Sequence, residues 1–90
     1  MAKTYKVIDF DQGAINRDLD ARRTNPQDLG QQVNSITDEL KKQGRDVGKG
    51  PNTPRGYPEG ILVSGKDEKD IHEGYRRAIK GTIFSDYSKT

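Results

Sequence analysis

A stretch near the middle of the chain, residues 44–60, decides where regular structure can form. Its 17 residues contain five glycines and three prolines, and its one aliphatic side chain is Val47. Proline cannot donate to a helix or a sheet ladder, and glycine weakens both, so this composition predicts a long Gly/Pro-rich loop. Long loops inside small domains are commonly functional or disordered. We therefore expect 44–60 to be either the binding element or the mobile element.

The residues just before this loop predict a helix over 26–43. Asn25 can cap it with its side-chain oxygen, and Pro26 suits the first helical position because an N–H there has no helical partner. Gly44 can adopt the left-handed conformation that ends a helix. Four apolar side chains follow one another at spacings of four, three and four residues: Leu29, Val33, Ile36 and Leu40. This spacing predicts one apolar helix face.

Shorter elements are predicted on both sides of that helix and loop. Residues 4–10 alternate in a way typical of a strand, and because both faces carry apolar groups we expect this strand inside a small sheet. The remaining patterns predict a helix over 12–23, a strand over 61–64 buried on both faces, a helix over 67–80, and a strand or extended tail over 82–87.

Together these elements predict an α+β fold in a single small domain spanning 1–90. Two or three helices would pack on a two- or three-stranded sheet, in the order β-α-α-loop-β-α-β. The core is thinly supplied, since Ile, Leu, Val and Phe make up 17 of 90 residues. That share is near the level seen in disordered chains, but a net charge of +2 is too low for that class. So few apolar side chains favour a modest scaffold that acts by contact over a walled pocket for catalysis.

The sequence also bears on the compartment. It contains no cysteine, so it has neither a disulfide framework nor a thiolate metal site, and a reducing compartment is expected. No apolar run has the length of a signal peptide or of a membrane span. We therefore expect a cytoplasmic protein with no membrane association.

The sequence does not favour an enzyme. His72 is the only histidine, and on a helix it lies one turn from Glu68 and Arg76, which favours a solvated surface pair over a general base. No serine has the glycine frame of a nucleophile elbow. We expect no catalytic residue and no cofactor.

A metal site is not favoured either. Asp9, Asp11 and Gly13 resemble the start of a calcium loop, but the glycine falls at position 5 of that loop and the twelfth residue is Asp20, so the register is wrong. The two aspartates are better interpreted as caps between a strand and a helix.

Two surfaces could carry a binding function. The first is the apolar face of Leu29, Val33, Ile36 and Leu40, which predicts contact with the domain's own core or an interface shared with a protein partner or a second copy. The second is cationic: Lys49 and Arg55 in the loop, Tyr57 just beyond them, and the helix end with Arg76, Arg77 and Lys80. Arg and Lys neutralise phosphate and a tyrosine can stack on a base. A solvated basic loop and a favourable helix dipole are the competing explanations of these charges.

Two functional hypotheses follow. The first is a small non-enzymatic interaction protein that binds a protein partner or self-associates. The alternative is an anion-binding module for nucleic acid or a phosphate-bearing small ligand. Salt discriminates between them, because phosphate contacts weaken steeply as the salt concentration rises and an apolar interface does not.

Overall fold

The longest helix of the fold begins where the capping residues predict. The computed structural model, which describes residues 3–87, places the Asn25 side chain 2.8 Å from the N–H of Asp28, which donates to it. The helix ends before Gly44, whose φ is +85°. In chain order the elements are β1 (Thr4–Asp9), α1 (Gln12–Asp20), α2 (Pro26–Lys42), β2 (Val47–Lys49), β3 (Gly60–Gly65), α3 (Glu68–Ile79) and a 3-10 turn η1 (Ile83–Asp86).

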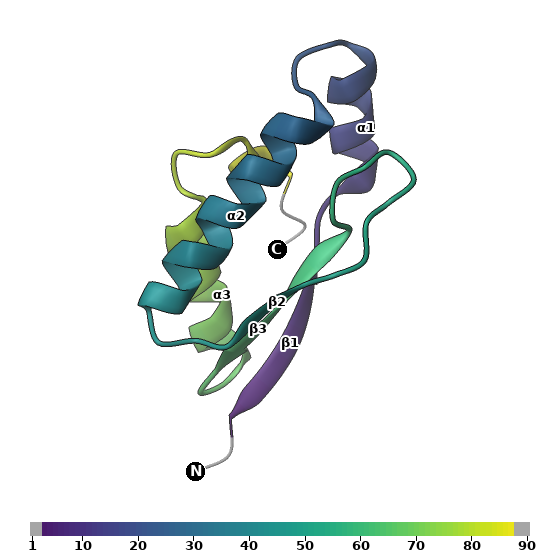
Figure 1. Ribbon diagram of the computed structural model, residues 1–90. Helices are drawn as coiled ribbons and strands as arrows, with labels where there is room; N and C mark the ends of the chain where they lie inside the picture. The colour runs from purple at the N-terminus through teal and green to yellow at the C-terminus, as the bar shows by residue number, and fades with distance from the viewer. Residues whose placement is uncertain (1–2, 88–90) are drawn as a thin grey trace.

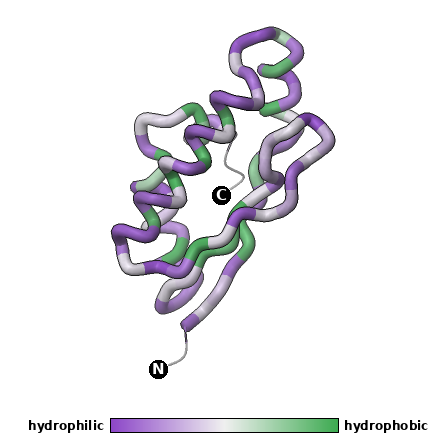
Figure 2. The backbone as a smooth tube through the Cα atoms, viewed as in Figure 1, coloured by the Kyte–Doolittle hydropathy of each residue, from purple (hydrophilic) through white to green (hydrophobic). Residues whose placement is uncertain are grey.

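These elements confirm the predicted α+β class and the three predicted helices, although α1 ends at Asp20, before the predicted end at residue 23. Figure 1 shows α2 and α3 side by side over one face of the sheet, with α1 beyond the end of β1. Figure 2 shows the apolar segments turned toward the space between the layers. Within residues 3–87 no helix is both long enough and apolar enough to cross a membrane.

The sheet differs from the prediction in which strand lies inside it. Its order is β1-β3-β2, with both neighbouring pairs antiparallel. The central strand is therefore β3, and β1 lies at an edge. The prediction that β1 lies inside the sheet was wrong. Apolar side chains on both faces of a strand do not require both faces to be buried: Ile8 is buried on one face, whereas Val7 on the other is 60% exposed.

Two further segments differ from their predictions. Val47–Lys49, inside the predicted loop, forms the second edge strand, because three residues suffice to pair with β3 even among glycines. Residues 82–87 form a 3-10 turn in place of a strand or extended tail. The turn places Phe84 against Phe10, with ring centroids 4.6 Å apart, which closes the end of the core that faces α1.

The apolar face of α2 lies in the core. Its four predicted side chains are fully buried among the residues of this chain: Leu29, Val33, Ile36 and Leu40. The alternative in which this face contacts the domain's own core is therefore confirmed, and the alternative in which it binds a partner was wrong for the folded chain. Because the chain has few apolar side chains, the apolar face of α2 packs in the interior of the domain.

Candidate interaction surface

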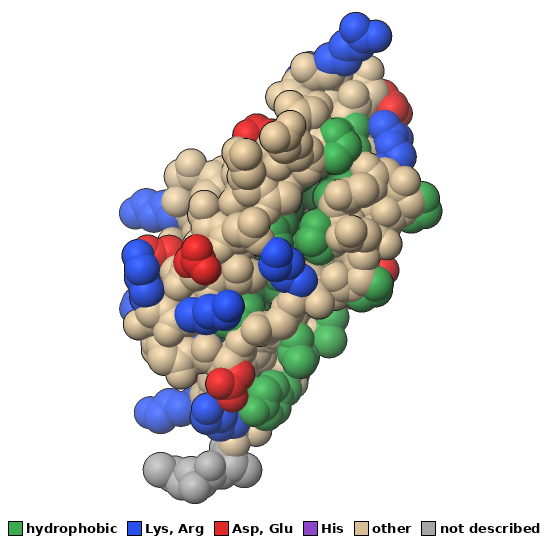
Figure 3. Space-filling model, in the orientation of Figure 1, with side chains coloured by type: hydrophobic (Ala, Val, Ile, Leu, Met, Phe, Trp, Pro, Cys, Tyr) green, Lys and Arg blue, Asp and Glu red, His purple; other side chains and the backbone are tan. Residues whose placement is uncertain are grey.

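The face of the sheet that the helices leave uncovered carries the largest exposed apolar side chains of the described residues. Tyr5 is 54% exposed, Val7 60% and Leu62 40%. Val7 is the direct cross-strand partner of Leu62, so the two side chains lie next to each other on this face. We call Tyr5, Val7 and Leu62 the apolar patch. Figure 3 shows hydrophobic side chains gathered along this side of the molecule.

Strand alternation explains the patch. Successive side chains of a strand point to opposite faces, so Thr4, Lys6 and Ile8 face the helices while Tyr5 and Val7 face outward. In β3, Leu62 points outward between the buried Ile61 and Val63. The prediction that 61–64 is buried on both faces was wrong for this reason. No sequence signal separates the two faces, since both carry aliphatic groups.

A hollow of about 240 Å³ adjoins the patch, and Gly48, Gly50 and Gly60 are among the residues that line it. Gly60 allows β1 and β3 to approach closely, because a Cβ at this position would lie 2.4 Å from the carbonyl oxygen of Ile8. A Cβ on Gly48, in contrast, would meet no atom within 4 Å. Glycine backbone and apolar side chains, among them Val7 and Leu62, therefore form part of the lining, together with the charged residues Asp9, Lys49 and Glu59.

Charged side chains lie at both ends of β1, and among the described residues they are paired at its start and unpaired at its end. At the start of the strand, Lys3 forms an ion pair of 3.1 Å with Asp46, and the Tyr5 hydroxyl donates to the same carboxylate at 3.1 Å. The hydrogen bond from Lys3 lowers the pKa of the Asp46 carboxyl. At the other end lie Asp9 and Glu59, which form no ion pair with any residue in 3–87.

The outer edge of β1 has free backbone groups. The N–H of Phe10 donates to the carbonyl of Glu59 at 3.0 Å, which shows that the even-numbered residues of β1 face β3. Hydrogen bonding in an antiparallel ladder alternates from residue to residue. The N–H and C=O groups of Tyr5, Val7 and Asp9 therefore point away from the sheet, where no other described strand pairs with them.

The structure does not bring the predicted anion-binding residues together. The Lys49 ammonium donates to Asn34 on α2, and Arg55 pairs with Asp20 at 2.8 Å. Figure 1 shows the 50–59 loop and the C-terminal end of α3 on opposite sides of α2. Three predicted cations lie at or just after that end of α3, all exposed: Arg76, Arg77 and Lys80. The single positive surface proposed from the sequence does not form.

Tyr57 is unavailable for stacking on a base. Its side chain is buried, and its hydroxyl donates to Asn16 at 2.8 Å. Burial raises the pKa of this phenol. The prediction was wrong because a tyrosine after a glycine-rich loop can serve as an anchor, holding residues 51–59 against α1.

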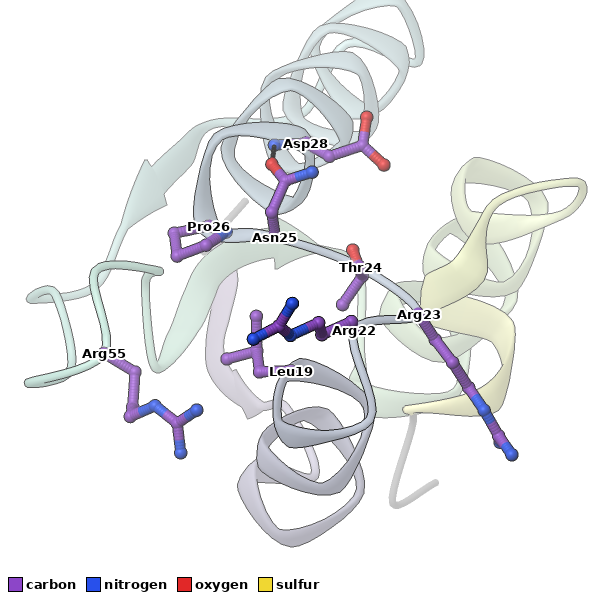
Figure 4. Close-up of a pocket in the computed structure, with 8 residues that line it drawn as sticks. All are labelled: Leu19, Arg22, Arg23, Thr24, Asn25, Pro26, Asp28 and Arg55. Carbon is purple, nitrogen blue, oxygen red and sulfur yellow. Dashed lines mark hydrogen bonds between the residues drawn. The ribbon is translucent and has the colours of Figure 1, made fainter.

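A second hollow, of about 480 Å³, lies where α1 ends and α2 begins (Figure 4). Arg22 reaches over Leu19 toward the first turn of α2, and Arg55 approaches from the loop, while Arg23 points away. The Thr24 hydroxyl in its wall is buried without a hydrogen-bond partner. Arg22 was not recognised in the sequence, because no charge pattern places it opposite Arg55.

Two other features bear on catalysis and metal binding. His72 is half-buried, and its Nδ1 is enclosed without a partner, so the predicted solvated pair with Glu68 and Arg76 is not found. Residues 3–87 contain no group of three or more His, Asp or Glu side chains arranged to hold a metal ion.

Comparisons with models of known protein families, with curated proteins and with solved structures found no match to this chain.

Proposed function

We propose that the protein is a non-enzymatic interaction module, and that its binding surface is the free edge of β1 together with the apolar patch. The observation that supports this proposal is the coincidence of the two features on one strand. Tyr5 and Val7 supply both exposed apolar side chains and outward backbone groups. An added strand would satisfy the backbone groups and cover the side chains at the same time. The cysteine-free sequence supports a cytoplasmic setting for this function.

The occupant we propose is an extended polypeptide strand that pairs antiparallel with β1. Lys3, which pairs with Asp46, and Lys6, which pairs with Glu68, lie toward the start of β1, and Asp9, unpaired within residues 3–87, lies at its end. An antiparallel partner brings its C-terminal end to the start of β1. Charge complementarity therefore favours a strand that is basic at its N-terminal end, apolar in the middle and acidic at its C-terminal end.

Synthetic peptides of about eight residues test this proposal. One peptide carries the favoured charge order around a central valine, and its control carries the same residues in reversed charge order. Fluorescence anisotropy on the dilute protein is expected to show binding of the first peptide with at least about tenfold preference over the second.

Val7→Pro supplies the matched variant for this test. The Val7 N–H points outward, so proline removes a donor from the free edge without removing one from the β1–β3 ladder. Val7→Thr keeps both the N–H and the branched side chain, and is the control. Peptide binding should survive in Val7→Thr and be lost in Val7→Pro. Failure of both peptides to bind, or equal binding by the two variants, would reject the proposal.

A specific observation favours a second function, the binding of a phosphate group in the hollow of Figure 4. Arg22 has no ion pair within residues 3–87, and it lies beside the unpartnered Thr24 hydroxyl and the N-terminus of α2. We rank it second because Arg55 is already paired with Asp20, and Asp28 also lines the hollow. Binding of inorganic phosphate that weakens with salt and is lost in Arg22→Gly would support it, and unchanged binding in that variant would exclude it.

A further inference from the structure

We infer that the strand added to β1 is β1 of a second copy of this chain, paired antiparallel about a two-fold axis through Val7. This inference rests on the proposed function, because it names the partner of that same surface. The structural basis is that β1 itself has the charge order required of its partner.

The charges of β1 are self-complementary. Lys3 lies just before the strand and Lys6 lies within it, whereas Asp9 is its last residue. When two copies run antiparallel, the basic end of each lies beside the acidic end of the other. Asp9 forms no ion pair within residues 3–87, so its carboxylate is free to accept from the partner's Lys3 or the partner's Tyr5, each of which would then be shared with, or exchanged from, the Asp46 of its own chain. A parallel arrangement would place like charges side by side and is disfavoured.

The outward backbone groups select the register. Only Tyr5, Val7 and Asp9 of β1 point their N–H and C=O groups to the free edge. Pairing Val7 with Val7 of the partner subunit puts Tyr5 opposite the partner's Asp9, and all three outward residues of each copy then make ladder hydrogen bonds. If one strand slides by two residues relative to the other, toward the start of β1, Asp9 lies opposite the partner's Lys3, which precedes β1, and not opposite a residue of the strand. This shift also sets Lys6 directly opposite the partner's Lys6, which is repulsive.

The side chains agree with this register. Residues directly opposite each other share a face, so the two Val7 side chains meet on the open face, each beside its own Leu62. The two exposed patches become one apolar strip across a six-stranded sheet, and the most exposed aliphatic side chains of each copy gain cover. The same pairing protects an edge strand that contains neither proline nor a bulge.

The absence of native cysteine makes the register directly testable. In Val7→Cys, the two introduced thiols lie opposite each other at a Cα separation of about 5.5 Å, within the range of a disulfide. In Leu62→Cys, the thiols lie on the same face but three strand spacings apart, roughly 14 Å, which is too far. Mixing Tyr5→Cys with Asp9→Cys should give a crosslinked heterodimer, whereas neither variant alone should crosslink.

The experiment combines sedimentation of the full chain, at concentrations up to about 1 mM, with mild oxidation of the cysteine variants. We expect a concentration-dependent dimer, its dissociation constant raised at least about tenfold in Val7→Pro and little changed in Val7→Thr. Circular dichroism of each variant confirms that it is folded. Crosslinking of Val7→Cys but not of Leu62→Cys supports the inference.

Three results overturn the inference, and they separate it from the proposed function. A strict monomer that still binds the charge-ordered peptide rejects self-pairing and leaves the interaction module standing. A dimer that is insensitive to Val7→Pro, or that crosslinks through Leu62→Cys, places the dimer contact elsewhere. A monomer that binds neither peptide removes both proposals together.

Discussion

The guanidinium of Arg45 and the carboxylate of Asp70 form a two-pronged ion pair, with Nη1–Oδ2 and Nη2–Oδ1 distances of 2.8 and 3.2 Å. Arg45 precedes β2, and its side chain is only 11% exposed. Asp70 lies in the first turn of α3. The pair therefore ties the start of one edge strand to the start of a helix. Two glycines accommodate it, since a Cβ on either Gly65 or Gly74 would lie 2.6 Å from a guanidinium nitrogen.

This ion pair predicts how stability depends on acid. The hydrogen bond from Arg45 holds the pKa of the Asp70 carboxyl well below its ordinary value. A group whose pKa is lowered in the folded state stabilises the fold above the pKa of the unfolded chain, about 3.9, and this contribution is lost as the pH falls further. Wild type should therefore lose stability steeply below about pH 4.

Asp70→Asn tests that pH dependence. At pH 7 the variant should be less stable than wild type, because Arg45 loses its charged partner in a largely buried position. Toward pH 2 the difference should narrow, because the stabilisation from the wild-type carboxylate is progressively lost below the pKa of the unfolded chain. Urea unfolding measured from pH 2 to 7 provides the comparison, and a difference that stays constant across that range would contradict the assignment.

A second prediction concerns the close approach of β1 and β3. A methyl group at Gly60 would meet the backbone oxygen of Ile8 at 2.4 Å, and backbone cannot move aside as a flexible side chain can. Gly60→Ala should lower the free energy of unfolding by about 1–3 kcal/mol or more. Gly48→Ala is the control, because it adds a methyl group to a strand with nothing within 4 Å. Equal denaturant midpoints for the two variants would show that the approach is not tight.

The sequence predicted most of the fold because most of its signals are local. Asn25, Pro26 and Gly44 act within one turn of the helix that they bound, so neighbouring residues suffice to place both ends. The exposed face of the sheet required more. Because β1 carries apolar side chains on both faces, the sequence does not show whether Val7 or Ile8 is buried. That depends on which face of the sheet α2 and α3 pack against. The free edge of β1 likewise depends on strand order, which alternation does not encode.

The cationic residues illustrate the same limit. Lys49, Arg55 and Arg77 are charged in any fold, but only tertiary structure decides whether they converge, and here α2 lies between the loop and the end of α3. Arg22 and Arg55 line the same hollow although they are far apart in sequence. Function at a surface of this kind depends on long-range contacts that composition and spacing do not contain.

A third prediction concerns the C-terminal turn. Phe84 is fully buried, packs against the tilted ring of Phe10 and meets the Tyr87 ring edge-on at a centroid distance of 5.6 Å. Phe84→Ala should cost about 3–5 kcal/mol, because the cavity it leaves lies between η1 and the start of α1. Ser85→Ala, an exposed change in the same turn, should shift the thermal midpoint little. A small loss for Phe84→Ala would mean that the turn contributes little to the core.

The last prediction concerns Arg22, the one described non-glycine residue with a positive φ, at 59°. The backbone N–H of Arg22 donates to the carbonyl oxygen of Leu19, and that of Arg23 donates to the carbonyl oxygen of Asp18. This is the hydrogen-bond pattern of a helix end that favours glycine. Arg22→Gly should therefore stabilise the protein by about 1 kcal/mol. Ala21→Gly, one residue earlier at an ordinary φ of −80°, should instead destabilise it.

Chemical denaturation of these two variants, combined with phosphate titration, separates two explanations for an arginine in a glycine position. If Arg22→Gly gains stability and loses phosphate binding, the strained backbone is retained for the ligand, as expected where function opposes stability. If it gains stability and binds phosphate as before, the hollow of Figure 4 is not a phosphate site. A loss of stability in Arg22→Gly would show that the guanidinium, lying over Leu19, stabilises the junction of α1 and α2 by more than its backbone strain costs.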